Sequence, residues 1–202
     1  AQKNRQKEIP VEKGIVSFVE NALFTTLTNV NFDAENHVEL LRESQKMKEN
    51  LRQQVQNAEN APFQAVYDLP QTKTEMLKDA KIAGIMYDKK LDPDLRSLRQ
   101  TILYGLKGIS AYGHQARELG YYSDQVDDFY IEALSALTED ERTVEELIRL
   151  TMRTGEMAVE VMKKLDEANT TCYGHPSPHS VSVHVKKGPF IIVSGHDLKD
   201  LE

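Results

Sequence analysis

Apolar residues recur every three or four positions over most of the chain, which is the spacing of one face of an α-helix. In the first half the pattern predicts three helices, over residues 15–27, 33–56 and 72–86. Asp33 is the expected N-cap of the second helix, whose polar majority predicts an exposed element. Residues 57–68 contain Pro62 and show no clear period, so we expect a connection there.

Three more helices are predicted before residue 168. Asp92-Pro93 should start the first, since the carboxylate can accept an orphan N–H and proline loses nothing at the first helical position. Leu119-Gly120 should end it, and Ser123 or Asp124 should open the second. Thr138 and Glu141 have capping-box spacing and should head the third. The residues expected to face inward from this third helix are Val144, Leu147, Ile148, Met152, Gly155, Val159, Met162 and Leu165.

The helix that follows Asp92 has an unusual glycine content. Gly105, Gly108 and Gly113 lie inside it, where each costs about 1 kcal/mol relative to alanine. We therefore expect a neighbouring helix or loop to approach closely at these glycines. The expected apolar stripe of the same helix comprises Leu95, Leu98, Ile102, Leu106, Ile109 and Tyr112.

The pattern changes after residue 168. Residues 181–185 alternate between apolar and polar, which predicts a strand, and the apolar run 190–193 predicts a strand covered on both faces. Residues 194–197 would be the strand-to-helix turn of an α/β unit. The predicted fold class is thus mainly α, followed by a short β segment that begins an α/β domain.

Composition narrows the function classes. The 202 residues carry a net charge of -7, which argues against general affinity for nucleic acid or anionic membranes. A single cysteine, Cys172, excludes an internal disulfide and a four-thiolate metal site. No apolar run is long enough to span a bilayer, and the N-terminus lacks the apolar core of a signal peptide. We expect a cytoplasmic protein and a chain that starts in the interior of a longer one.

Two stretches resemble each other at an offset of roughly 110 residues, by alignment of 18–23 with 129–134. The similarity is either a chance match or a duplication of a three-helix bundle. With a duplication, the first bundle lacks its first helix. The predicted domains are an incomplete helical bundle over 1–88, a second three-helix bundle over 89–168, and the truncated start of an α/β domain over 169–202.

Four motifs occur in an order and spacing similar to those of the hybrid cluster proteins, also called prismane proteins or hydroxylamine reductases. The motifs are residues 26–33, 103–108, 173–176 and 194–201. The resemblance implies two helical bundles followed by two α/β domains that hold an Fe-S-O hybrid cluster. It also implies a 4Fe-4S or 2Fe-2S cluster on an N-terminal four-cysteine motif.

This chain departs from the family at most of the cluster ligands. The four-cysteine motif is absent, and Cys172 lies where the family has no ligand. By resemblance, His196 of the Ser-Gly-His-Asp motif is the one hybrid-cluster iron ligand that the chain carries. Because one imidazole cannot hold such a cluster, we expect the isolated chain to bind no cluster and to be inactive.

The other candidate residues favour structural roles. His184 alternates with valines and should face solvent or an edge, and prolines near His175 and His179 prevent helical zinc pairing. His37 and His114 lack the Glu-x-x-His pattern of di-iron bundles. We expect solvated helix faces at Asp127, Asp128, Glu156 and Glu160, and core packing at Met152, Met157 and Met162.

Two functions remain open. By resemblance, the parent protein is an oxidoreductase that takes electrons from a donor and reduces hydroxylamine to ammonia, with nitric oxide as the alternative substrate. The other function is a non-catalytic helical module that binds no metal and self-associates through surfaces left apolar. The expected partners are a small nitrogen-oxide substrate, an electron donor and a second copy of the chain, with neither nucleic acid nor membrane.

Overall fold

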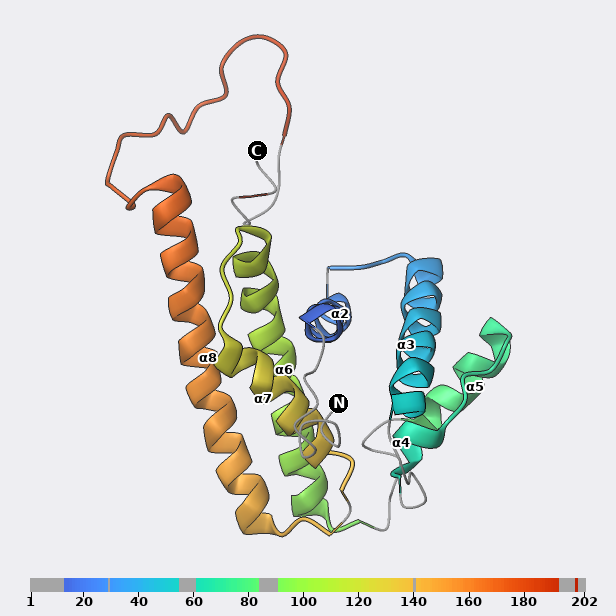
Figure 1. The fold of residues 1–202 in the computed structure, drawn as a ribbon. Helices are drawn as coiled ribbons and strands as arrows, with labels where there is room; N and C mark the ends of the chain where they lie inside the picture. Colours follow the sequence, from blue (N-terminus) through green and yellow to red (C-terminus); the bar gives the residue numbers. More distant parts are fainter. Residues whose placement is uncertain are drawn as a thin grey trace.

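Helices account for most of the chain that the computed structural model describes, which comprises residues 13–28, 30–54, 61–83, 91–139, 141–192 and 199 (Figure 1). The helices are α2 (Lys13–Thr25), α3 (Ala34–Gln54), α4 (Phe63–Val66), α5 (Lys73–Ala83), α6 (Pro93–Glu118), α7 (Asp124–Ala136) and α8 (Val144–Tyr173). The prediction of a mainly helical chain is confirmed. In this described part, no helix is both long and apolar enough to cross a membrane.

The ends of α6 lie where the sequence predicts. Asp92 Oδ1 accepts hydrogen bonds from the backbone N–H groups of Asp94 and Leu95, at 2.8 and 3.4 Å. At the other end, the N–H of Gly120 donates to the carbonyl of Arg117 and the N–H of Tyr121 to that of Ala116, both at 2.9 Å. This double closure is a Schellman motif, and it requires the positive φ of 83° at Gly120.

The start of α8 differs from the prediction. The capping box lies at Thr143 and Glu146, where the Thr143 hydroxyl accepts from the Glu146 N–H at 3.3 Å and the Glu146 carboxylate accepts from the Thr143 N–H at 2.9 Å. Thr138 instead closes the end of α7, since its hydroxyl donates to the Ser135 carbonyl at 2.7 Å. The spacing of threonine and glutamate occurs twice, at residues 138 and 141 and at residues 143 and 146. The second of these pairs forms the cap.

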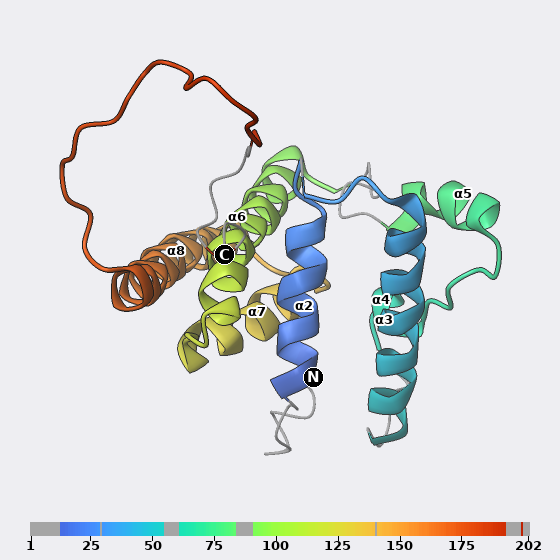
Figure 2. The ribbon, with the colours of Figure 1, turned by 90° about the horizontal axis from the view of Figure 1, so that it is seen from above.

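The core lies where α6, α7 and α8 pack against one another, with α2 lying across α6 and α7. Helix α2 is seen end-on in Figure 1 and lengthwise in Figure 2. The core includes Val16 of α2, Ile102, Leu106 and Ile109 of α6, Phe129 and Tyr130 of α7, and Leu147, Leu150, Met157 and Val161 of α8. Three consecutive helices and α2, which is distant from them in the sequence, therefore share one apolar interior.

Helices α3, α4 and α5 stand beside this core (Figure 2), and polar contacts connect them to one another. The Lys48 ammonium of α3 donates to the Tyr67 carbonyl, and the Tyr67 hydroxyl donates to the Asp79 carboxylate of α5 at 2.9 Å. Helix α4 lies inside the stretch that we expected to be a connection, so that expectation is wrong for its four residues.

Two of the three glycines in α6 are explained by close approach. A Cβ atom on Gly105 would lie 2.4 Å from Thr154 Cγ2 of α8, and one on Gly113 would lie 2.5 Å from Glu20 Oε2 of α2. Gly108 has no neighbour within 4 Å of that position, so the expectation is wrong there.

The inward face of α8 was predicted wrongly at several positions. Leu147 is buried as expected, but five of the named residues are exposed, namely Val144, Ile148, Met152, Val159 and Met162. Tyr112, expected on the apolar stripe of α6, is also 43% exposed. Helix α8 carries two separate apolar stripes, and periodicity cannot distinguish the one that packs from the one that faces solvent.

Residues 174–192 follow α8 as irregular, exposed chain. The expected strand over 181–185 does not form, nor does the expected strand over the described residues 190–192. A strand needs a partner for its backbone hydrogen bonds, and the described part of the chain offers none. Residues 193–198, and His196 with them, lie outside the described residues. The division into domains 1–88, 89–168 and 169–202 stays a prediction.

Candidate functional site

Four polar side chains from three helices meet inside the protein where α2 crosses α6 and α7. The guanidinium of Arg117 donates to both carboxylate oxygens of Glu20, with N–O distances of 2.8 and 3.4 Å. The same guanidinium donates to Asp127 Oδ1 at 2.5 Å, and the Tyr130 hydroxyl donates to Glu20 Oε2 at 3.5 Å. We call these four residues the buried polar cluster.

The buried polar cluster is held mostly away from water. The side chain of Glu20 is 2% exposed, that of Asp127 11% and that of Arg117 21%. The guanidinium also lies 5.4 Å from the ring centre of Tyr122, which covers part of its remaining surface. A buried charge is costly unless it is paired and hydrogen-bonded. Arg117 provides the ion pair and the hydrogen bonds for both carboxylates.

The surroundings shift the pKa values of three cluster residues. Burial raises the pKa of the Glu20 carboxyl, and the neighbouring Arg117 opposes this shift only in part. Burial raises the pKa of the Tyr130 hydroxyl far above its ordinary value, and the Glu20 charge adds to that effect. Burial lowers the pKa of Arg117, but its bonds to Glu20 and Asp127 outweigh this and raise it overall. Tyr130 and Arg117 therefore keep their protons at neutral pH.

The space beside the buried polar cluster is too small for a substrate. Gly113 allows the Glu20 carboxylate to approach the α6 backbone, and the adjoining cavity has a volume of about 10 Å³. Such a cavity holds at most one water molecule. The cluster is therefore a structural connection that fixes α2 to α6 and α7.

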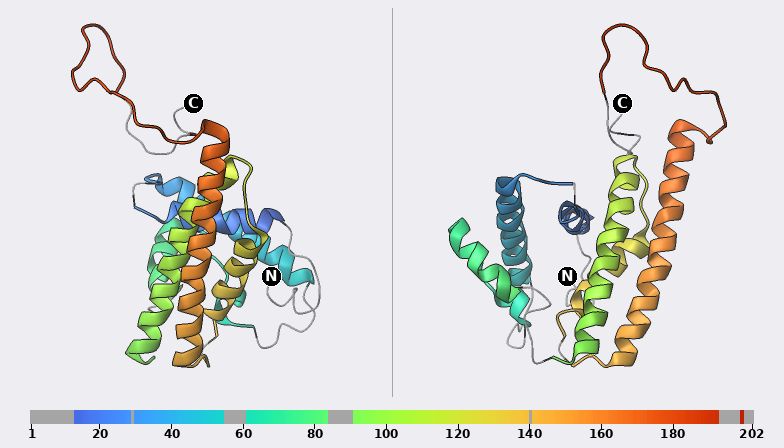
Figure 3. Two further views of the ribbon diagram at one scale, coloured as in Figure 1. Left: turned by 90° about the vertical axis from the view of Figure 1, so that its left-hand side faces the viewer. Right: turned by 180° about the vertical axis from the view of Figure 1, so that it is seen from behind.

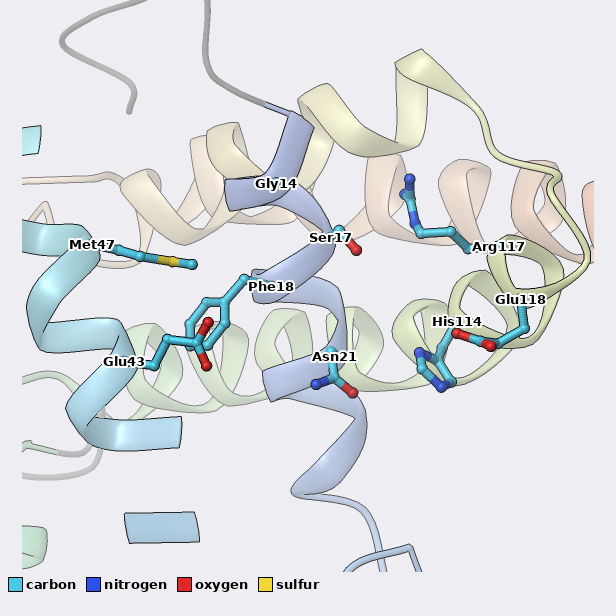
Figure 4. Close-up of a pocket in the computed structure, with 9 residues that line it drawn as sticks. All are labelled: Gly14, Ser17, Phe18, Asn21, Glu43, Met47, His114, Arg117 and Glu118. Carbon is cyan, nitrogen blue, oxygen red and sulfur yellow. The ribbon is translucent and has the colours of Figure 1, made fainter. Parts of the chain in front are cut away.

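A larger cleft of about 400 Å³ opens on the other side of Arg117, with α2 between α3 and the end of α6 (Figure 4). Glu43 and Met47 of α3 line one side of the cleft, and His114 and Glu118 of α6 line the other. The His114 ring stacks on Phe24 of α2, with ring centres 4.6 Å apart. The cleft is open and polar, and its histidine is already packed against an aromatic ring.

The described residues do not fit an iron–sulfur cluster. Within the part of the chain that the structure describes, no group of three or more His, Cys, Asp or Glu side chains could hold a metal ion. Cys172 is exposed in the last turn of α8. His196, the predicted iron ligand, lies outside the described residues.

The structure also places the other residues that sequence analysis singled out. Asp127 is buried and ion-paired, so its prediction as a solvated helix face is wrong. Met157 is buried as expected, whereas Met152 and Met162 are exposed. The remaining candidates are exposed or half-buried, namely His37, His114, Asp128, Glu156, Glu160, His175, His179 and His184.

Sequence analysis missed the central pair of the buried polar cluster, Glu20 and Arg117. The sequence did contain a signal that Glu20 is buried. Glu20 lies one turn from Val16, which is in the core, and one turn from Leu23, which packs against it. A lone carboxylate on the apolar face of a helix predicts a buried partner of opposite charge.

The fold and the buried polar cluster together define a helical-bundle domain whose helices are connected by an internal ion-pair network. The model of the Prismane/CO dehydrogenase family matches residues 2–202, and the chain belongs to this family.

Relatives with the name hydroxylamine reductase cover nearly the whole chain. The one from Bacteroides fragilis (strain YCH46) is 40% identical over 185 residues, which are 92% of this chain and 33% of that protein. The one from Acetivibrio thermocellus is 40% identical over 91% of this chain and 33% of its own length. The one from Caldanaerobacter subterraneus subsp. tengcongensis is 35% identical over 98% of this chain and 37% of its own length. The chain thus spans about a third of the length of the curated relatives that it matches.

Proposed function

We propose that the chain is the helical part of an iron–sulfur oxidoreductase that reduces hydroxylamine to ammonia. The observation that carries this proposal is the 40% identity to a hydroxylamine reductase over 92% of the chain. In the overall reaction, hydroxylamine takes up two electrons and two protons, its N–O bond breaks, and ammonia and water leave. The electrons come from a donor that the sequence does not identify.

The described residues support a framework role in this reaction. The buried polar cluster fixes α2 to α6 and α7, and α8 packs along α6. The iron–sulfur clusters implied by the family would supply the redox chemistry when bound, and the described residues offer no set of ligands for them. We propose His196 as an iron ligand, because imidazole suits iron and the family motif carries a histidine at this place.

The test uses the protein produced anaerobically at the full length that its gene encodes. We expect several iron atoms and labile sulfides per chain, and oxidation of a reduced dye that depends on hydroxylamine. His196→Ala should lower both the iron content and the rate, whereas the matched control His184→Ala, at an exposed position, should change neither. A His196→Ala protein with full iron content and full activity would contradict the assignment of this ligand.

Nitric oxide is the alternative substrate, and the same assay distinguishes it. A rate with nitric oxide that exceeds the rate with hydroxylamine at equal concentrations would assign the activity to nitric oxide.

A cytoplasmic location of the protein remains a prediction.

A non-catalytic, self-associating module is the second candidate, and the exposed apolar residues of α8 favour it. Anaerobic reconstitution of the 202-residue chain tests it. Iron and sulfide well below one per chain would favour the module for the isolated chain. Several irons per chain, with absorption bands lost in His196→Ala, would contradict it.

A further inference from the structure

The side of α8 that does not pack in the core carries a second apolar stripe. Its side chains are Val144, Ile148, Met152, Val159 and Met162, which are 37%, 47%, 67%, 63% and 45% exposed. With Gly155 they recur at intervals of four, four, three, four and three residues, so all six lie along one line on the helix. We call these six residues the outer stripe.

The outer stripe is long, straight and accessible. It extends over about 27 Å at 1.5 Å per residue. Helix α8 forms one flank of the molecule, and in the left view of Figure 3 it lies in front of the other helices. Gly155, near the middle, is exposed and has no neighbour within 4 Å of a Cβ position. A second helix could therefore approach closely at this point.

Charged residues accompany the outer stripe on one side. Each stripe residue is directly followed by a charged residue, and these six are exposed except for the half-buried Glu160. They are Glu145, Arg149, Arg153, Glu156, Glu160 and Lys163. One residue further along a helix means a turn of 100° in the same direction, so the six charges share one side of the outer stripe. In chain order their signs are negative, positive, positive, negative, negative and positive.

We propose that the outer stripe is a self-association surface, on which α8 of a second copy packs antiparallel about a two-fold axis between residues 153 and 154. This register places Ile148 opposite Val159 and Met152 opposite Gly155, and it brings Val144 within one residue of the position opposite Met162. The methionine side chain fills the space that the glycine leaves. Each contact occurs twice, as a two-fold interface requires.

The charges favour the same antiparallel arrangement. Reversal of one helix brings Glu145 near the Lys163 of the other copy and Arg149 near its Glu156 and Glu160, so each of these negative charges meets a positive one. Arg153 lies next to the axis, near the Glu156 of the other copy, and is also paired with Glu132 of its own chain. Parallel packing about a two-fold axis along the helices would put the charged sides of the two copies on opposite sides of the interface, so these charges would not pair with one another. Charge complementarity thus selects a second copy of this chain as the partner and sets the direction in which its helix runs.

Sedimentation equilibrium of the 202-residue chain at increasing concentration measures the association. We expect a mass that rises from 23.0 kDa toward twice that value. Met152→Glu should weaken association by at least about a hundredfold, since it buries a carboxylate in the interface and brings the two copies of that carboxylate close together on either side of the two-fold axis. The position is 67% exposed, so circular dichroism should show an unchanged helix content. The control Ile191→Ser, in the exposed segment after α8, should leave association unchanged.

A charge exchange tests the register. Arg149→Glu and Glu156→Arg should each weaken association, and the double variant should restore it, because the pair is exchanged across the two-fold axis. Gly155→Leu should weaken association without loss of helix content.

A mass of 23.0 kDa at every concentration would overturn the proposal. The outer stripe would then be a contact surface for a different protein or a further domain. Loss of association in Ile191→Ser but not in Met152→Glu would overturn it as well. These outcomes do not depend on the reductase activity.

Discussion

Arg117 of α6 donates two hydrogen bonds to Glu20 of α2, although the two residues are 97 positions apart in the chain. The same guanidinium also bonds Asp127 of α7. One side chain thus connects three helices at a point where nearly all water is excluded, and α2 has no comparable polar contact elsewhere in the described residues.

Loss of the arginine should destabilise the fold strongly. Arg117→Met leaves the Glu20 carboxylate buried with no positive partner, and we expect the free energy of unfolding to fall by about 3 kcal/mol. Urea unfolding measures the change. The matched control is Arg142→Met, which removes the exposed pairs with Glu139 and Glu146 and should cost less than about 1 kcal/mol. Equal losses in the two variants would contradict a special role for the buried polar cluster.

The pH dependence of stability should carry a signature of Glu20. Burial raises the folded-state pKa of this carboxyl above its unfolded value, so the folded state binds the proton more tightly. Ionised Glu20 therefore costs stability, and the cost is removed as the pH falls through the folded pKa. We expect wild type to gain free energy of unfolding relative to Glu20→Gln as the pH is lowered from neutral. Urea titrations of both proteins over a pH series measure this, and a relative loss at acid pH would show the opposite shift.

Two glycines of α6 should respond to alanine in opposite directions. Gly108→Ala fills open space and gains helix propensity, so stability should rise by up to about 1 kcal/mol. Gly113→Ala places a methyl group 2.5 Å from Glu20 Oε2 and 3.2 Å from the Tyr130 hydroxyl, and Glu20 is held there by Arg117. We expect a net loss of about 1–2 kcal/mol, since displacement of the carboxylate outweighs the gain in propensity. Thermal unfolding of the pair gives the comparison, and a rise for both would mean that the carboxylate moves freely.

The two threonines with capping-box spacing provide a further test. Thr143→Ala removes the side-chain acceptor for the Glu146 N–H and should cost about 1 kcal/mol. Thr138→Ala removes only a hydroxyl that donates to the Ser135 carbonyl, and we expect a smaller loss. Urea unfolding of the two variants distinguishes them. A larger loss for Thr138→Ala would place the effective cap where sequence analysis expected it.

Local signals predicted the helices well because they act within one turn. Asp92 and Gly120 each determine an end of α6 by bonds to residues two to four positions away, which a sequence displays directly. The two threonines show the limit of such signals, since both match the pattern and only the end of α7 decides between them.

Features that depend on distant residues could not be predicted in this way. Asp127 resembles an ordinary surface carboxylate until Arg117 and Glu20 are brought beside it. The outer stripe has the same periodicity as the core stripe of α8, so only the packing of α6 and α7 shows which of the two is buried. Residues 181–185 have the alternation of a strand, but pairing requires a partner strand that the described chain lacks. For His196, the sequence supplies a family motif, and its surroundings lie outside the described residues.

The position of α2 has a kinetic consequence. Arg117 and Asp127 are 10 positions apart and can meet early, whereas the contact between Glu20 and Arg117 must close a much longer loop. We therefore expect α6, α7 and α8 to form the folding nucleus and α2 to dock after the transition state. Stopped-flow measurements should show Glu20→Gln changing the unfolding rate while the refolding rate stays constant. Of the four helices that form the core, α2 would then also be the first to exchange its amide hydrogens in the native protein, and the core would open from its side.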